Sequence, residues 1–306
     1  MFDVVVLALA DQPQKSDVRV PVRACLDALA AAGARGSAVT ATSDQEIDQV
    51  VAGLAAAGAG QRLVVASASD AQLRAVVRRM ARHWAPPPSK RPPDLPAHRT
   101  MPDLPPLAVL PLDPAAGKDL PAGGGSAAGE GPAGPGDLAG QLGLPRHPAA
   151  VASAVLGERV RRVDLLRQDG GSVTLEGVLL GSSDQAGRAV PWQARIEVDD
   201  AVLSDGTEPL LAGVVANGGR QRQPDGLPLI ATADPTDGVV EAAVAVPVRR
   251  RWQRRARVEV RRARGRAVLV RPTGDGVACL DDGVAGELRR QRSWWVEAGA
   301  WGVYTT

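Results

Sequence analysis

The hydrophobic pattern of this chain changes its period near residue 160, and this change limits what the chain can fold into. Before that point, short apolar runs such as residues 3–8 alternate with stretches whose apolar residues recur every three to four positions, as in residues 20–32. Beyond it, apolar and polar residues alternate with period two. The first pattern is typical of strands joined by helices, and the second is typical of antiparallel strands.

The N-terminal pattern predicts a doubly wound α/β lobe. Strand and helix patterns follow one another three times, and Ser43 and Glu46 form the capping-box signature of a helix start. This spacing favours a parallel sheet with helices on both faces and right-handed crossovers. The expected strands are residues 3–8, 37–41, 62–66 and 107–112, and the expected helices begin near residues 20, 44, 70 and 148.

The C-terminal pattern predicts a β-sandwich lobe. Runs of alternating apolar residues are joined by turns rich in Gly, Asp and Pro, with scarcely a helical stretch among them. We therefore expect an α/β lobe over residues 1–160, a β-sandwich lobe over residues 161–306, and a cleft between the two lobes. The expected strands of the second lobe are residues 173–180, 189–198, 210–216, 239–246, 257–261, 267–271 and 293–296.

Two low-complexity segments interrupt the first lobe. Residues 84–106 hold nine prolines, a density that excludes a helix or a central strand and favours an extended, solvated linker. Residues 113–136 hold eight glycines and four prolines, and such a composition buries too little apolar surface to offset its ordering entropy. We expect both segments to be poorly ordered.

Charge and cysteine content exclude several classes of protein. The 36 basic and 34 acidic side chains leave a net charge of +2, so no overall field attracts nucleic acid or an anionic membrane. Cys25 and Cys279 are the only cysteines, too few for a disulfide framework, which fits a reducing cytoplasm. The first apolar run follows an acid and is too short to span a bilayer. We expect a cytoplasmic protein without a signal peptide or a transmembrane segment.

Three turn sequences follow one another in the last third of the chain: Asn-Gly-Gly at 217–219, Asp-Pro-x-Asp-Gly at 234–238 and Leu-Asp-Asp-Gly at 280–283. Glycine turns that carry a carboxylate can present a base to a substrate hydroxyl without burying a charge in the core. Together with the apolar strand at 107–112 and Leu-Ala-x-x-Leu-Gly-Leu-Pro at 138–145, this order resembles the diacylglycerol kinase catalytic family of lipid kinases. The similarity covers nearly the whole chain.

The resemblance implies that the terminal phosphoryl group of ATP, with Mg2+, is transferred to a lipid hydroxyl such as that of diacylglycerol. It makes Asp282 the candidate base, because the family's Asp-Gly-Glu turn is thought to accept the hydroxyl proton. Val284 replaces the glutamate, a loss for which Asp281 or Glu287 could compensate. A solvated hairpin turn is the alternative interpretation of Asp282.

The resemblance also places Asn217, Asp234 and Asp237 in the substrate cleft. An Asp-Pro-x-Asp-Gly sequence is equally typical of a type I turn, which is the alternative for the two aspartates. The three histidines of the chain are scattered, so no metal ligand can be assigned from the sequence.

The family's phosphate loop is Gly-Gly-Asp-Gly-Thr, placed where bare backbone and a helix N-terminus approach the triphosphate. At the matching position of this chain the aspartate is present and every glycine is replaced. Side chains there penalise left-handed backbone angles and block close approach of an anion, so an ordinary capped helix start is the alternative. By resemblance, the nucleotide-contacting residues are Ser67, Ala68, Ser69, Asp70, Ala71 and Gln72.

Two further nucleotide elements of the family are altered. Its early Asn-Pro-x-Ser-Gly turn is replaced by Leu-Ala-Asp-Gln-Pro at 9–13, and the glycine element expected after Leu112 gives way to the insertion. The loss of three elements together leaves two functions open. The chain is either a lipid kinase or a non-catalytic pseudoenzyme of the same fold that serves as a scaffold or regulatory protein.

Residues 249–266 hold ten arginines and one acid. Alternation with Val and Ala puts several arginines on one solvent face of an edge hairpin, where they also oppose edge-to-edge aggregation. Peripheral contact with an anionic lipid surface is the alternative, and nucleic acid is disfavoured because only Trp252 in this run could stack on a base. The expected partners are thus a lipid substrate or an anionic membrane surface, and the oligomeric state stays open.

Overall fold

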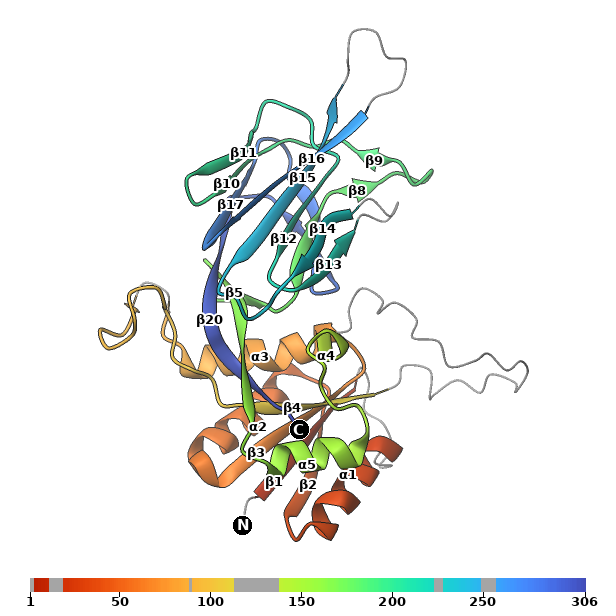
Figure 1. The fold of residues 1–306 in the computed structure, drawn as a ribbon, viewed down its shortest axis with the longest axis vertical. Coiled ribbons are helices and arrows are strands. Elements are labelled where there is room, and N and C mark those ends of the chain that lie inside the picture. Colours follow the sequence, from red (N-terminus) through yellow and green to blue (C-terminus); the bar gives the residue numbers. More distant parts are fainter. Residues whose placement is uncertain (1–2, 11–18, 88–89, 113–137, 223–227, 249–256) are drawn as a thin grey trace, which may run out of the picture. The chain divides into compact units, whose positions relative to one another are not determined.

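The computed structural model describes residues 3–10, 19–87, 90–112, 138–222, 228–248 and 257–306 (Figure 1). The chain forms two compact units. Unit 1 comprises Met1–Arg79, Pro106–Arg161 and Val303–Thr306, and unit 2 comprises Met80–Pro105 and Arg162–Gly302. Each unit thus draws on segments that are far apart in the sequence. The expected insertion at 113–136 and the first part of the arginine run, 249–256, lie outside the described residues.

Unit 1 is a parallel sheet with helices on both faces, as the alternating strand and helix patterns predict. Its elements are β1 (Asp3–Leu9), α1 (Val20–Ala31), β2 (Arg35–Ala41), α2 (Asp44–Ala57), a 3-10 turn (Gly58–Gly60), β3 (Gln61–Ser67), α3 (Asp70–Trp84), β4 (Leu107–Pro111), α4 (Leu138–Gln141), α5 (Pro148–Leu156) and the end of β20 (Arg292–Tyr304). The strands pair in parallel in the order β4-β3-β1-β2, and Val303 of β20 pairs with Leu107 of β4.

Alternate residues of β1 are buried on opposite faces of this sheet. Val6 packs in one cluster with Cys25 of α1 and Val151 of α5. Leu7 points the other way, because successive strand residues face opposite sides, and it is also fully buried. A strand covered on both faces is continuously apolar, which explains the uninterrupted run in the sequence.

The predicted start of α2 is confirmed. Ser43 Oγ accepts the N–H of Glu46 at 3.3 Å, and the Glu46 carboxylate accepts the N–H of Ser43 at 3.1 Å, so the capping box of α2 is complete. The backbone N–H of Thr42 also donates to Glu46 and is the main reason that its pKa lies below the usual range. Gly33, with a φ of 77°, follows the end of α1.

Unit 2 is built from antiparallel strands, as the period-two pattern predicts. One sheet has the order β16-β15-β12-β7-β18-β19, and the other pairs β11-β10-β17-β20, with β5 joining β20 and β6. Two short hairpins, β8–β9 and β13–β14, complete the unit. The strands are β5 (Val160–Gln168), β6 (Val173–Thr174), β7 (Gly177–Leu180), β8 (Ser182–Ser183), β9 (Ala189–Val190), β10 (Ala194–Val198), β11 (Ala201–Asp205), β12 (Ala212–Ala216), β13 (Gly219–Arg222), β14 (Pro228–Ala233), β15 (Val240–Val248), β16 (Arg257–Gly265), β17 (Ala267–Pro272), β18 (Val277–Asp281) and β19 (Val284–Leu288).

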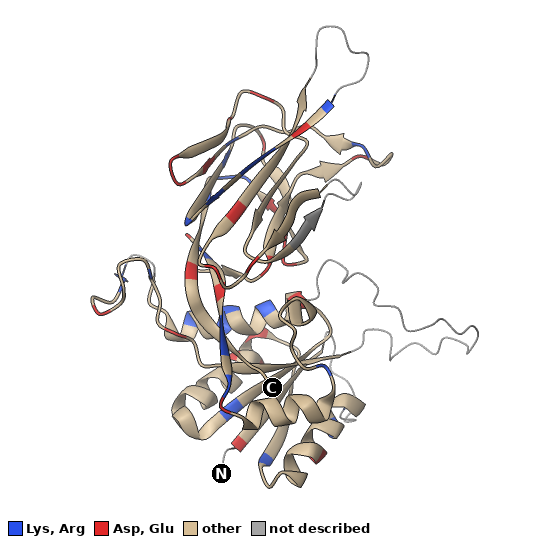
Figure 2. Ribbon diagram, in the orientation of Figure 1, with Lys and Arg blue, Asp and Glu red and all other residues tan. Residues whose placement is uncertain are grey.

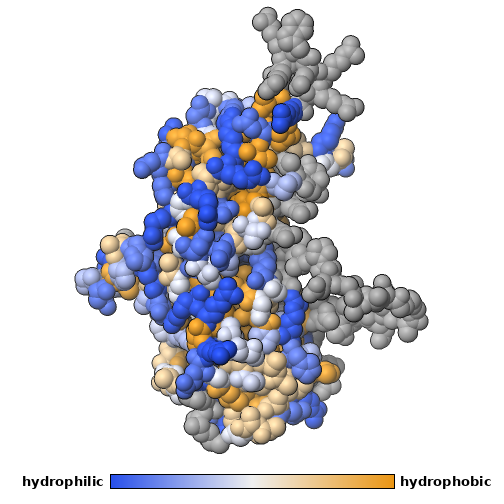
Figure 3. All heavy atoms as spheres, in the orientation of Figure 1, coloured by the Kyte–Doolittle hydropathy of each residue, from blue (hydrophilic) through white to orange (hydrophobic). Residues whose placement is uncertain are grey.

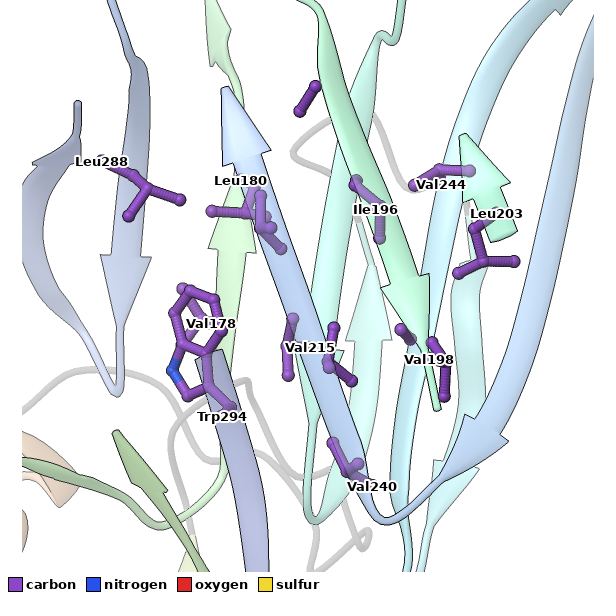
Figure 4. Packing of buried hydrophobic residues seen from close by; sticks show 14 of the residues in the cluster. Val178, Leu180, Ile196, Val198, Leu203, Val215, Val240, Val244, Leu288 and Trp294 are labelled. Carbon is purple, nitrogen blue, oxygen red and sulfur yellow. The ribbon is translucent and has the colours of Figure 1, made fainter. Parts of the chain in front are cut away.

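The core of unit 2 lies between its two sheets. Val178 and Leu180 of β7 pack with Ile196 of β10 and Trp294 of β20 in one buried cluster, and Figure 4 shows their side chains gathered between the strands. Valine dominates this cluster because its branched side chain fits a pleated surface, which lets the core form with few aromatic residues. The expected cleft between the two lobes stays a prediction.

The end of the proline-rich segment, residues 100–104, packs against the strands of unit 2 and is less solvated than its composition indicates, whereas residues 90–98 are mostly exposed. Met101 and Leu104 are fully buried, and the N–H of Leu104 donates to the carbonyl of Ala300 at 2.7 Å. The prolines exclude regular structure here, but they leave carbonyl groups that other side chains can bond.

A group of buried and half-buried polar residues, which we call the Thr100 cluster, holds this segment. It consists of Thr100, Arg167, Trp295 and Glu297. Arg167 donates to the hydroxyl of Thr100 at 2.7 Å and to its carbonyl at 3.0 Å. The Glu297 carboxylate accepts the N–H of Thr100 at 2.9 and 3.0 Å and the indole N–H of Trp295 at 2.9 Å. Glu297 is fully buried, so these donors replace the water that its charge has lost.

Charged residues of both signs are distributed through each unit (Figure 2). On the face shown in Figure 3, hydrophobic and hydrophilic residues are interspersed. The described part of the chain contains no helix that is both long and apolar enough to cross a lipid bilayer.

Candidate functional site

The loop from β3 to α3, residues 67–72, is a helix start stabilised by its own side chains. The N–H of Ala68 donates to Gln72 Oε1 at 2.9 Å, and the N–H of Gln72 donates to Ser69 Oγ at 3.4 Å. None of these residues has a positive φ. The capped helix start, which was the alternative interpretation, is therefore present, and two backbone amides of the loop are already bonded within it.

Asp70, the residue retained from the family's phosphate loop, has a structural contact in unit 1. Its carboxylate accepts the N–H of Leu138, the first residue of α4, at 3.0 Å. Nearby, the carbonyl of Ser67 accepts the N–H of Leu112 at 2.8 Å. The loop is thus tied both to the end of β4 and to the element that follows the insertion.

The predicted base lies in the two-residue turn between β18 and β19. Asp282 and Gly283 have φ values of 46° and 81°, between the paired residues Asp281 and Val284. Positive φ at both central positions is the requirement of a type I′ hairpin turn, and Asp-Gly is one of its preferred sequences. The hairpin turn that the sequence suggested is present.

Asp282 is buried rather than solvated, and both oxygens of its carboxylate are bonded by the main chain. Oδ2 accepts the N–H of Leu175 at 2.7 Å, and Oδ1 accepts those of Glu176 and Gly177 at 2.9 and 3.0 Å. Asp282 also donates its own N–H to the carbonyl of Gly177 at 3.0 Å. The carboxylate therefore fixes the segment that leads into β7, and its role as a base stays a prediction.

Asp281, which could replace the missing glutamate, is also buried. Its Oδ1 accepts the hydroxyl of Thr174 at 2.7 Å, and its Oδ2 accepts the side-chain amide of Gln168 at 2.9 Å. These bonds direct Asp281 toward β5 and β6. The sequence patterns did not single out Thr174 or Gln168, the two partners of Asp281. Polar residues within apolar strands are nevertheless a signal of a buried hydrogen-bond network.

Asn217 contacts the same segment as Asp282. It is fully buried, its side-chain N–H groups donate to the carbonyls of Asp164 and Leu175 at 2.9 Å, and its backbone N–H donates to Glu176 at 2.8 Å. Among the residues that the structure describes, its Oδ1 has no hydrogen-bond partner. The structure thus brings Asn217 and Asp282 together at residues 175–177.

Asp234 and Asp237 are exposed and stabilise the turn between β14 and β15. Asp234 Oδ1 accepts the N–H and the hydroxyl of Thr236 at 3.0 and 2.7 Å. Asp237 Oδ1 accepts the N–H of Val239 at 3.0 Å, and its Oδ2 pairs with Arg264 at 2.6 Å. These contacts are those of a local turn, and a role in substrate binding stays a prediction.

Asp164 of β5 is a buried carboxylate that the sequence patterns do not single out. It is 2% exposed, and its two oxygens accept the N–H groups of Gly299 and Gly238, each at 2.7 Å. Burial raises its pKa above the usual range, the two N–H donors oppose that rise, and the charges of Asp237 and Asp234 add to it. The sequence does carry one signal that Asp164 is buried, because this carboxylate stands between two apolar residues of a strand.

Asp164 makes the stability of unit 2 depend on pH. Because its pKa is raised in the folded state, its stabilising contribution is fully present below the ordinary value of 3.8 and is lost as the pH rises through the raised value. We expect the stability advantage of the wild type over Asp164→Asn to shrink as the pH rises above 3.8 and through the raised pKa of Asp164. Urea unfolding of both proteins at each pH measures this difference, and a constant difference would contradict the prediction.

Three of the four arginines of β16 are engaged within the protein. Arg261 pairs with Glu208, Arg264 pairs with Asp237, and Arg262 donates to backbone carbonyls of β14. The strand lies at the edge of the six-stranded sheet, as the sequence indicates for this hairpin. Paired arginines at an edge oppose association through the free strand, and contact with an anionic membrane stays a prediction.

The residues of the loop do not fit the Mg2+–ATP complex that the resemblance implies. A phosphate loop needs unbonded amides and glycine at the points of closest approach. Here the amides of Ala68 and Gln72 are bonded to side chains, and Ala71 carries a Cβ in place of glycine. In the described ranges, no group of three or more His, Cys, Asp or Glu side chains is placed to hold a metal ion.

No protein-family model matches this sequence, and no curated protein matches it. Solved structures do share its fold. A diacylglycerol kinase from Bacillus anthracis str. Sterne superposes with a TM-score of 0.64 at 14% identity, over 99% of this chain and 96% of that one. Two further structures from the same organism, whose assignment as diacylglycerol kinases is provisional, give TM-scores of 0.65 and 0.62 at 14% and 15% identity, again over 99% of this chain and over 96% and 97% of theirs. The chain therefore has a diacylglycerol-kinase-like fold.

Proposed function

We propose that this protein is a non-catalytic member of the lipid-kinase fold, a scaffold or regulatory protein that does not transfer phosphate from ATP. The loop at 67–72 carries the proposal, because Gln72 Oε1 bonds the amide of Ala68 at 2.9 Å and Ser69 Oγ bonds the amide of Gln72. A triphosphate would have to displace both side chains, and it would still meet Cβ atoms where the family has glycine.

The turn at Asp282 supports the same function. A general base must hold a lone pair within reach of the substrate hydroxyl. The two oxygens of Asp282 already accept three backbone N–H groups, so protonating this carboxylate would weaken bonds that position β7. A carboxylate held in this way is suited to fixing a hairpin.

The second candidate is a lipid kinase that transfers the terminal phosphoryl group of ATP, with Mg2+, to a lipid hydroxyl. Its support is the shared fold, which extends over 99% of the chain, and the retained Asp70. For this activity Gln72 would have to leave the amide of Ala68 before the nucleotide binds.

Nucleotide titration separates the two candidates. We expect isothermal titration with ATP and Mg2+ to give no saturable heat up to about 1 mM ATP, the upper end of typical KM values. Circular dichroism confirms that the sample is folded, and an active lipid kinase of the same fold serves as the positive control. Saturable ATP binding, together with phosphorylation of mixed lipid vesicles that Asp70→Ala abolishes, would establish the kinase instead.

A further inference from the structure

Strand β2 is an uncovered edge of the parallel sheet of unit 1. It stands at the end of the strand order β4-β3-β1-β2, and no described strand pairs with its outer side (Figure 1). All its residues from Arg35 to Thr40 are exposed, so the helices on the two faces of the sheet do not cover it. Such a strand presents a row of unpaired backbone N–H and C=O groups, which can pair with a strand of another chain.

The alternation of the backbone identifies which groups of β2 point outward. The carbonyl of Ala41 accepts the N–H of Ala10 at 3.1 Å, so it points to the β1 side. In a strand, the N–H and C=O of one residue point to the same side, and this side alternates from residue to residue. The backbone groups of Gly36, Ala38 and Thr40 therefore point away from β1. They offer three donors and three acceptors, placed symmetrically about Ala38.

Three other edge strands of the large sheets carry features that oppose such pairing. β16 holds four arginines, β19 carries Glu287, and the pairing of β11 with β10 has a register shift between Ile196 and Glu197. Strand β2 contains no proline, and its pairing with β1 has no register shift. Its single charged residue, Arg35, is at its first position and pairs with Asp3 at 2.8 Å. Strand β2 thus lacks the usual protection of an edge.

We propose that β2 is a self-association surface, through which two copies of this chain pair as antiparallel strands about a two-fold axis at Ala38. A two-fold axis is the commonest symmetry of homo-oligomers. In this register Ala38 faces its own counterpart, and Gly36 faces Thr40 of the second copy. Each facing pair exchanges two hydrogen bonds, so every outward group of both strands is bonded. The two Arg35 side chains lie about 20 Å apart, at opposite ends of the pairing, so their like charges do not oppose it.

A second copy is favoured over an unrelated peptide because the outward groups are symmetric and β2 has no charge pattern that would select another sequence. Beyond Asp27 in α1 and beyond Gln49 in α2, the exposed residues of the two helices that contact β2 are only alanine and glycine. Short side chains leave room for a second copy but give an interface below the standard size of about 1,600 Å². We therefore expect a reversible dimer with a Kd on the order of 10 μM, formed without nucleotide.

Sedimentation equilibrium of the full chain provides the first test. The mass should rise from 31.7 kDa toward twice that value as the concentration increases from about one-tenth to about ten times the expected Kd. It should rise in the same way whatever the outcome of the ATP titration, because β2 includes no residue of the 67–72 loop. A mass of 31.7 kDa at every concentration, or one that increases beyond the dimer, would overturn the proposal.

Two charge variants at the two-fold axis provide the second test. In Ala38→Lys and in Ala38→Glu, like charges face each other across the axis, so the Kd of each variant alone should rise about fivefold or more. An equimolar mixture of the two should dimerise again, because lysine then faces glutamate. Circular dichroism checks that both variants are folded. Only this register brings residue 38 opposite itself, so a mixture no better associated than either variant alone would contradict the pairing.

Ala285→Lys is the matched control. Ala285 is also an exposed alanine of an edge strand, but it belongs to β19 in the six-stranded sheet of unit 2. Its replacement should leave the Kd of the dimer unchanged. A dimer that Ala285→Lys weakens and Ala38→Lys does not would place the interface on β19 and would rule out association through β2.

Discussion

Replacing Asp282 with alanine is expected to lower the free energy of unfolding by about 4 kcal/mol, because buried donors left without an acceptor cost about 1–3 kcal/mol each. The donors are the N–H groups of Leu175, Glu176 and Gly177, all of which are buried. Alanine must also adopt the φ of 46° at this position, which aspartate tolerates better. Chemical denaturation monitored by circular dichroism measures the loss.

Asp199 offers a matched control for this experiment. It also has a positive φ, 47°, and its carboxylate accepts two backbone N–H groups, those of Arg266 and Ala267, at 2.8 and 2.9 Å. Asp199 is exposed, so water can replace its side chain, and Asp199→Ala should cost only about 1–2 kcal/mol. Equal losses in the two variants would show that burial of the Asp282 carboxylate contributes nothing.

The same contacts affect how activity data on Asp282 should be interpreted. Asp282→Asn keeps one acceptor oxygen and places its NH2 group against at least one of the three N–H donors, so it should also destabilise the protein. Loss of activity in an Asp282 variant is therefore evidence for a base only where the variant is shown to be folded at the assay temperature.

Replacing Glu297 with alanine is expected to cost about 3–5 kcal/mol, the usual effect of removing one partner from a buried ionic group. Glu297 is fully buried and Arg167 is 3% exposed, and the hydroxyl of Thr100 lies between them in the Thr100 cluster. Burial lowers the pKa of Arg167, and the charge of Glu297 opposes that shift. Without Glu297, the guanidinium would remain buried with its charge uncompensated. Denaturant unfolding measures the loss.

An exposed ion pair is the control for Glu297. Glu287 pairs with Arg289 at 2.8 Å on the surface, and Glu287→Ala should cost less than about 1 kcal/mol. Hydrogen exchange of Thr100 and Leu104 should rise in Glu297→Ala, because the cluster holds this segment. A stability loss no larger than that of Glu287→Ala, with unchanged exchange, would show that the Thr100 cluster does not hold the segment.

Much of the secondary structure could be predicted because its signals are local. The capping box at Ser43 and Glu46 and the apolar run of β1 act over a few residues, and they have the same meaning in any fold. Strand and helix periodicities predicted both the parallel sheet of unit 1 and the antiparallel strands of unit 2. The replacement of glycine in the 67–72 loop was also visible, since a Cβ restricts the backbone wherever the loop is placed.

The candidate site could be located from its motifs, but the burial of its groups could not. Asp282 bonds residues that precede it by 105 to 107 positions, and Glu297 bonds Thr100 across 197 positions. No local pattern encodes such pairs, because they form only when distant strands align. The sequence alone therefore determined the elements, their caps and the loss of the phosphate-loop glycines. Tertiary structure decided which carboxylates are buried and which strand forms the uncovered edge of the parallel sheet, because both depend on strand pairing between distant segments.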